Sequence, residues 1–162
     1  MKKLSIPLLA SVLAVSVAAC GSSNSSTTKT TATTAPAKTV SVVVITAKKE
    51  PGLGTVLVDS QGKTLYQFLP DAGKHVTCTG GCAGVWPPVM LPTGAKVGAS
   101  GGVKASLLSS DADPTGGRVV TYAGWPLYTY VADSSPGSHT GQGINLNGGL
   151  WYVMSPTGQA IK

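Results

Sequence analysis

The sequence predicts a mainly β protein, in which two tandem hairpin-based repeats pack into one small antiparallel β domain after a disordered tether. The main observation is a recurrence: residues 65–71 and 127–133 both read Leu-Tyr, a spacer, an aromatic residue, two further residues and Asp. Each copy is followed by a tryptophan and then by Val-Met-x-Pro-Thr-Gly, at 89–94 and 153–158. The 21 glycines and 11 prolines supply turns, and no long helical period is present.

The N-terminus predicts lipidation. Two lysines precede an apolar run at 4–17, which is too short for a typical membrane span, and Val-Ala-Ala-Cys then ends at Cys20. This ending resembles a bacterial lipobox, so residues 1–19 are expected to be a lipoprotein signal peptide. Cys20 would carry the lipid, such as palmitate, and anchor the chain to the extracytoplasmic face of the cell membrane. The alternative is an ordinary signal peptide cut near Ala19, with Cys20 as a spare thiol.

The next segments predict a spacer and then the folded part. Residues 20–39 are almost entirely Ser, Thr, Ala, Gly and Lys, which predicts a lipidated flexible tether. Residues 40–50 are rich in β-branched side chains and are either a strand or an extended arm. The duplicated domain is expected at 51–162, with repeat one at about 52–94 and repeat two at about 117–158. Between the repeats, we expect a connection with a single short element at 103–108.

Each repeat is expected to begin with a β-hairpin. The strands are 55–58 and 63–68 in the first repeat, and 118–122 and 125–130 in the second. Alternation places Tyr66 and Phe68 on one face of the strand and Leu65 and Leu69 on the other. Because both faces are apolar, the strand should be covered on both sides. A last strand is expected at 150–154.

The charge balance gives no sign of a nucleic-acid footprint, and no nucleic-acid partner is expected. The formal net charge is +6, but most of the excess lies in the signal peptide and tether. From Pro51 onward, six basic side chains are nearly balanced by five aspartates. The expected partners are the membrane, through the lipid on Cys20, and an unknown envelope protein, polymer or small ligand.

Several stretches resemble a known family. They are 62–71 and 78–88 in the first repeat, and 124–133, 136–137, 141–143 and 151–153 in the second. Together they resemble bacterial lipoproteins with tandem Tyr-x-(Phe/Trp/Tyr)-x-x-Asp motifs, a secreted repeat of unknown function. The resemblance covers residues 51–162 and implies a cell-envelope lipoprotein without an established reaction. The second repeat lacks the cysteine pair of the first, which argues against two equivalent metal or redox centres.

The motif residues are expected to be mainly structural. Asp71 and Asp133 should accept backbone N–H bonds in the turns that follow them. The alternative places both carboxylates beside tyrosine hydroxyls as a cation or ligand site. The aromatic members of the motif are expected to fill the core, with partners for their polar ends. They are Tyr66, Phe68, Trp86, Tyr128, Tyr130 and Trp151.

Cys78 and Cys82 predict a disulfide, because an even cysteine pair in an oxidising compartment favours one. A five-residue ring would stabilise the fold by about 2 kcal/mol. The alternative is a copper or redox site built from His75, Cys78, Cys82 and Met90, since these are soft ligands that suit copper. A structural zinc site would need reduced thiols and a fourth ligand.

The signs of an enzyme are poor. There is no His-Glu-x-x-His, and the only glutamate, Glu50, lies outside the repeats as bounded above. His139 is expected to be solvated in a glycine-rich loop. We therefore expect a non-enzymatic, membrane-anchored binding or interaction module without a cofactor. A copper-binding or redox envelope protein is the alternative, and an enzyme ranks last.

Overall fold

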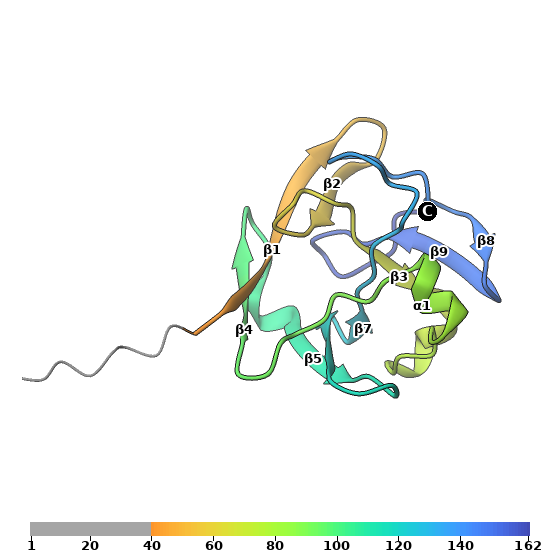
Figure 1. Cartoon of the computed structure of the whole chain (residues 1–162). Coiled ribbons are helices and arrows are strands. Elements are labelled where there is room, and N and C mark those ends of the chain that lie inside the picture. The colour runs from red at the N-terminus through yellow and green to blue at the C-terminus, as the bar shows by residue number, and fades with distance from the viewer. Residues whose placement is uncertain (1–39) are drawn as a thin grey trace, which may run out of the picture. The chain divides into compact units, whose positions relative to one another are not determined.

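The computed structural model describes residues 40–162, and Figure 1 shows their course. The strands are β1 (Val42–Glu50), β2 (Gly54–Val58), β3 (Tyr66–Phe68), β4 (Lys96–Ser100), β5 (Leu108–Ala112), β6 (Arg118–Tyr122), β7 (Trp125–Pro126), β8 (Asn145–Leu146) and β9 (Gly149–Val153). The helical pieces are α1 (Gly81–Val85) and two 3-10 turns, η1 (Leu69–Gly73) and η2 (Ala105–Leu107). The predicted mainly β fold is confirmed.

The predictions for the N-terminus concern residues that the structure does not describe. The signal peptide, Cys20 and the tether lie outside the described part of the chain. Within residues 40–162, no helix combines the length and the apolar character that crossing a membrane requires.

The strands form three small sheets, in the orders β2-β1-β4, β3-β9-β8 and β5-β6-β7. The segment 40–50 forms a strand rather than an arm, because β1 pairs antiparallel with β2 and parallel with β4. The stretch 94–117 holds β4, η2 and β5, where a single short element was expected. The sequence of β4 has a weak strand pattern, and this strand packs closely against its partner β1. A Cβ at Gly98 would lie 2.9 Å from a methyl carbon of Val42, so the close approach requires glycine.

The hairpin β1–β2 is the counterpart of the hairpin β5–β6. Leu57 pairs with Ala47 in the first, and Val120 pairs with Ser110 in the second. The next strand then returns in the same way, since Leu65 N–H donates to Leu57 at 2.9 Å and Leu127 N–H donates to Val120 at 3.0 Å. The duplication therefore includes β1, which lies before residue 51.

The ends of the two repeats are aligned differently from the sequence match. Val89 N–H donates to the Leu127 carbonyl, whereas Met154 N–H donates to the equivalent Leu65 carbonyl. Val89 is therefore the structural counterpart of Met154. The match between the two sequences aligned Val89 with Val153, which is one residue out of register. As a result Met154 is buried, while Met90 is 42% exposed.

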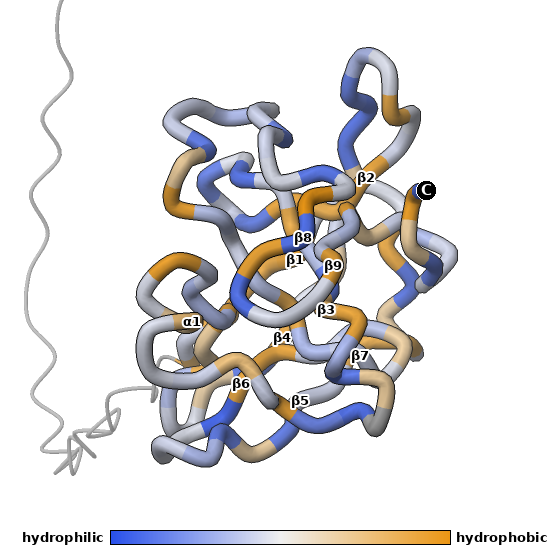
Figure 2. The backbone as a smooth tube through the Cα atoms, turned by 90° about the vertical axis from the view of Figure 1, so that its right-hand side faces the viewer, coloured by the Kyte–Doolittle hydropathy of each residue, from blue (hydrophilic) through white to orange (hydrophobic). Residues whose placement is uncertain are grey.

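The core has two clusters, and each draws on both repeats. The aromatic cluster contains Val56, Val58, Tyr66, Phe68, Cys78, Trp86, Tyr128, Trp151 and Val153. The aliphatic cluster contains Ile45, Leu57, Leu65, Val103, Val120, Tyr122, Leu127 and Met154. The side chains at 65–68 are all buried, with Leu65 in the aliphatic cluster and Tyr66 and Phe68 in the aromatic one, so the predicted cover on both sides is confirmed there. Leu69, which was expected on the same face as Leu65, lies in η1 and is half-buried. Figure 2 shows hydrophobic residues along the central strands, among them β1, β3 and β9.

Candidate functional site

Two tyrosines join the repeats at the centre of the domain. Tyr66 N–H donates to the Tyr128 carbonyl at 2.9 Å, and Tyr128 N–H donates to the Tyr66 carbonyl at 3.0 Å. This mutual exchange is the pattern of a hydrogen-bonded antiparallel pair. The two copies of the motif therefore meet backbone to backbone.

The side chains of the same tyrosines cross to the opposite repeats. The Tyr66 hydroxyl donates to Oδ2 of Asp133 at 2.6 Å, and the Tyr128 hydroxyl donates to Oδ2 of Asp71 at 2.6 Å. All four side chains are buried. We call this set the crossed Tyr–Asp centre; each half of it depends on the other repeat.

The second oxygen of each carboxylate holds the turn that follows. Asp71 Oδ1 accepts bonds from the backbone N–H and the hydroxyl of Thr77, at 2.9 and 2.5 Å. Asp133 Oδ1 accepts the same two bonds from Thr140, at 2.8 and 2.7 Å. With the tyrosine hydroxyl, each carboxylate accepts three hydrogen bonds, which favours a structural junction over a cation site. Sequence reasoning missed both threonines, although each follows its aspartate by six or seven residues.

The buried environment keeps the tyrosines protonated. Burial raises the pKa of Tyr66 and of Tyr128 far above the ordinary value, and the hydrogen bond to the opposite carboxylate adds to the rise. Burial also raises the pKa of Asp71, against the bonds from Thr77 and Tyr128, which lower it. The hydroxyls therefore act as permanent donors over the physiological pH range.

Four aromatic rings form a continuous stack beside the crossed centre. Phe68 stacks on Trp151 with ring centroids 4.1 Å apart, Trp151 on Trp86 at 3.9 Å, and Trp86 on Tyr130 at 4.1 Å. The order along the stack alternates between repeat one and repeat two. Both tryptophans are fully buried, so these rings contribute to the core and not to a binding platform.

The tyrosines of the crossed centre close the stack from the side. Tyr66 contacts Trp86 edge-on with centroids 5.3 Å apart, and Tyr128 contacts Trp151 edge-on at 5.2 Å. Such edge-to-face pairs stabilise beyond the burial of area, by roughly 0.5–1.5 kcal/mol each. The tryptophans therefore connect the stack to the hydrogen-bonded centre.

The cysteine pair forms a disulfide, Cys78–Cys82, with the Cα atoms 5.2 Å apart. It links the segment after Asp71 to the first turn of α1, the helix that precedes Trp86.

The disulfide uses both thiols that the copper alternative needs. Of the other two proposed ligands, His75 Nδ1 lies 3.0 Å from a carboxylate oxygen of Asp111, and Met90 takes part in a bridge with Val119. Among residues 40–162, no group of three or more His, Cys, Asp and Glu side chains is placed to hold a metal ion. His139 Nδ1 lies 3.0 Å from the Gly137 carbonyl within its own loop.

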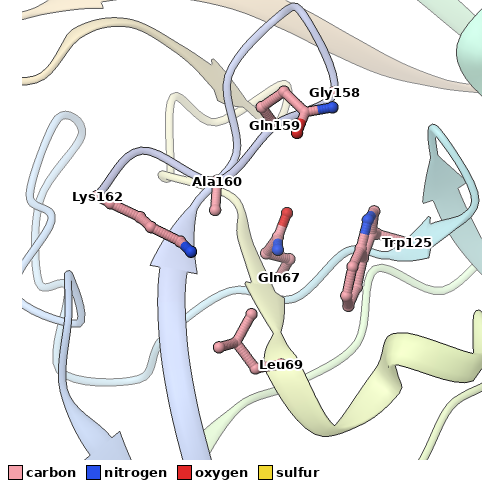
Figure 3. Close-up of a pocket in the computed structure, with 7 residues that line it drawn as sticks. All are labelled: Gln67, Leu69, Trp125, Gly158, Gln159, Ala160 and Lys162. Carbon is pink, nitrogen blue, oxygen red and sulfur yellow. The ribbon is translucent and has the colours of Figure 1, made fainter.

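An open hollow of about 210 Å³ lies on the face of β3 opposite the aromatic cluster. Its lining residues are Gln67, Leu69, Trp125, Gly158, Gln159, Ala160 and Lys162. Figure 3 shows Gln67 in the middle, with Trp125 on one side and Ala160 and Lys162 on the other. Gln67 is only 3% exposed, and its Oε1 is buried without a hydrogen-bond partner.

Two lysines lie near aromatic rings, Lys74 near Trp125 and Lys162 near Tyr152, and Trp125 and Lys162 line the hollow. Lys74 Nζ is 3.9 Å from the centroid of the Trp125 ring and also donates to the Ala123 carbonyl at 3.3 Å. Lys162 Nζ is 6.0 Å from the centroid of Tyr152, a distance at the outer limit of a cation–π contact. The hollow thus combines an indole, a buried amide oxygen and an ammonium group.

Sequence reasoning missed the hollow entirely. Gln67 was the spacer of the motif, and its place in the second copy is taken by Thr129. The available signal was a glutamine between Leu65 and Leu69, on a strand expected to be buried on both sides. A polar side chain at such a position needs a partner.

The chain matches a family described as Lipoprotein_15, a secreted repeat of unknown function, over residues 47–90 and 109–155. The two segments begin within β1 and β5, as the equivalence of the two hairpins requires. No curated protein and no solved structure matches the chain.

Proposed function

We propose that this chain, which belongs to the Lipoprotein_15 family of secreted repeats, is a non-enzymatic binding module held at the extracytoplasmic face of the cell membrane by a lipid on Cys20. Family membership implies an extracytoplasmic protein. The lipid anchor is inferred from the sequence around Cys20, and the binding role from the hollow beside Gln67.

The observation that carries the binding role is the unpaired Oε1 of Gln67. A buried acceptor without a donor costs about 1–3 kcal/mol, so a ligand that donates a hydrogen bond to it would recover that cost. Two other buried side-chain atoms among residues 40–162 lack a hydrogen-bond partner, Glu50 Oε1 and Trp86 Nε1. Of these, Glu50 Oε1 is satisfied by its ion pair with the ammonium of Lys48 at 2.9 Å, and Trp86 Nε1 lies inside the aromatic stack. Of the three residues, Gln67 alone lines the hollow described above.

The lining of the hollow favours binding over catalysis. It offers amides, an indole, apolar contacts and one ammonium, which are groups that orient a ligand. It brings no nucleophile next to a base. The crossed Tyr–Asp centre lies on the other side of β3 and supplies a rigid support for the strand that carries Gln67.

The lipid anchor is tested with the variant Cys20→Ala. The expected result is unprocessed precursor or soluble protein, and loss of labelling by an alkyne analogue of palmitate. A processed variant that remains in the membrane fraction would show that another feature anchors the chain.

The binding role is tested through Trp125, which is half-buried, whereas Trp86 and Trp151 are fully buried. Acrylamide quenching of the full chain in detergent should therefore report mainly on Trp125. A soluble extract of the cell envelope is expected to protect Trp125 from quenching. In Gln67→Met, the amount of extract needed should rise about tenfold, the equivalent of one hydrogen bond.

The matched control is Gln61→Met, at an exposed position in the turn between β2 and β3. It should behave like the unchanged chain. The proposal fails if the extract never alters the quenching, or if the two methionine variants respond alike.

A further inference from the structure

We infer that the ligand of the hollow is a saccharide unit of a cell-envelope glycan, stacked on the indole of Trp125 and donating a hydroxyl hydrogen bond to Oε1 of Gln67. This inference rests on the proposed function and names the ligand class for the same site.

The size of the hollow suits one sugar unit. Its volume, about 210 Å³, is below the roughly 300–1,000 Å³ typical of sites for drug-sized ligands. The hollow is open to solvent, so the glycan chain can continue outward from the bound unit. An open site with one deep polar contact fits one residue of a polymer better than a small molecule that must be enclosed.

The indole supplies the platform. Figure 3 shows the Trp125 ring edge-on, so that one face is turned toward Gln67 and the hollow. The face of an aromatic ring carries partial negative charge, and it packs well against the slightly positive C–H groups of a pyranose face. Lys74, whose ammonium lies over the same indole, does not line the hollow.

The polar groups suit a ring of hydroxyls. Each hydroxyl is both a donor and an acceptor, as is each side-chain amide, whereas the lysine ammonium only donates. A hydroxyl can donate to Oε1 of Gln67, and its neighbours can exchange bonds with Gln159 and accept from Lys162. Figure 3 shows Gln67 in the middle, Gln159 above it and Lys162 on the side away from Trp125.

The same groups argue against two other ligand classes. An anion such as phosphate or a carboxylate would bring acceptor oxygens against Oε1 of Gln67, which is itself an acceptor. A peptide could donate a backbone N–H to Gln67, but a peptide unit lacks the broad C–H face that Trp125 favours. Glycans are also available to an extracytoplasmic protein.

The test uses soluble envelope polysaccharide released by mild acid, added to the full chain in detergent, with acrylamide quenching of Trp125 as the readout. One portion is oxidised with periodate, which cleaves the vicinal diols of sugars, and another is digested with proteinase K. The inference predicts that protection survives the proteinase and is lost after periodate. Protection that survives periodate but not proteinase overturns the saccharide assignment and leaves the binding role in place. If no preparation protects Trp125, the binding role itself fails.

A second measurement separates stacking from folding. Calorimetric titration with the proteinase-treated polysaccharide compares Trp125→Phe with Trp125→Leu, after both variants are shown by circular dichroism to melt cooperatively. The phenyl ring retains a platform, so Trp125→Phe should bind within about threefold of the unchanged chain, and Trp125→Leu at least tenfold more weakly, about 1.4 kcal/mol. Equal binding by the two variants contradicts the stacked geometry.

Discussion

The Tyr66 hydroxyl donates a 2.6 Å hydrogen bond to Asp133, 67 residues away, and not to Asp71, the aspartate of its own motif. Tyr128 repeats the relationship in reverse with Asp71. A single repeat would therefore bury a hydroxyl and a carboxylate without their partners, at about 1–3 kcal/mol for each group. This gives a physical reason why the motif occurs twice in one domain.

The ring stack leaves no room beside Gly141. A Cβ at this position would lie 2.6 Å from Cη2 of Trp86 and 3.1 Å from Cδ1 of Tyr130. We expect Gly141→Ala to lower the free energy of unfolding by about 1–3 kcal/mol, as overpacking commonly does. The matched control is Gly84→Ala in α1, where the added methyl meets nothing within 4 Å. Urea denaturation should show no loss of stability in the control; an equal loss in both variants would contradict the tight stack.

The Cys78–Cys82 disulfide closes a ring of five residues and should contribute about 2 kcal/mol. Reductant is expected to destabilise the unchanged chain by about this amount and to leave the double variant Cys78→Ser/Cys82→Ser unaffected. In a Cys20→Ser background, thiol labelling should detect no free thiol before reduction and two after it. Two thiols that label without reductant, and that copper protects, would support the copper site instead.

Alkaline pH should weaken the fold through the crossed Tyr–Asp centre. The pKa values of Tyr66 and Tyr128 are raised in the folded state, so the folded chain keeps both protons where the unfolded chain releases them. Stability is therefore fully present below the unfolded tyrosine pKa of about 10 and falls above it, by about 2.7 kcal/mol per pH unit for the two groups. Urea denaturation at increasing pH should show this slope, and the double variant Tyr66→Phe/Tyr128→Phe should lose it.

Gln67 is expected to cost stability in the free protein. Replacing it by methionine removes the unpaired buried acceptor and keeps a similar volume, so Gln67→Met should raise the free energy of unfolding by about 1–3 kcal/mol. Gln61→Met, in the exposed turn, should stay within about 0.5 kcal/mol of the unchanged chain. If Gln67→Met destabilises the domain, the amide has a partner and the main argument for the ligand site is lost.

The periodic features of the sequence predicted much of this fold. Alternation in the motif placed Tyr66 and Leu65 in different core clusters, as the structure has them. The repeated motif Leu-Tyr-x-aromatic-x-x-Asp also predicted two halves that share one hydrophobic core. These features are local in the chain, and periodicity reports them directly.

Features set by tertiary contact could not be read in the same way. Strand β4 pairs in parallel with β1 from more than fifty residues away, which its own composition does not indicate. Pro88 lies opposite Tyr128 in repeat one, as Val153 lies opposite Tyr66 in repeat two. The end of repeat one is therefore shifted by one residue relative to the sequence match. The exchange of aspartates between the repeats is equally invisible in the sequence, because the motif reads the same whether its bonds stay within a repeat or cross.

The most direct test is a pair of double-mutant cycles on the free energy of unfolding. Tyr66→Phe is combined with Asp133→Ala in one cycle and with Asp71→Ala in the other. The crossed centre predicts a coupling energy of about 1–3 kcal/mol for Tyr66 with Asp133, and less than about 0.5 kcal/mol for Tyr66 with Asp71. A coupling with Asp71 equal to or larger than that with Asp133 would show that each motif closes on itself, and would contradict the interlocked repeats.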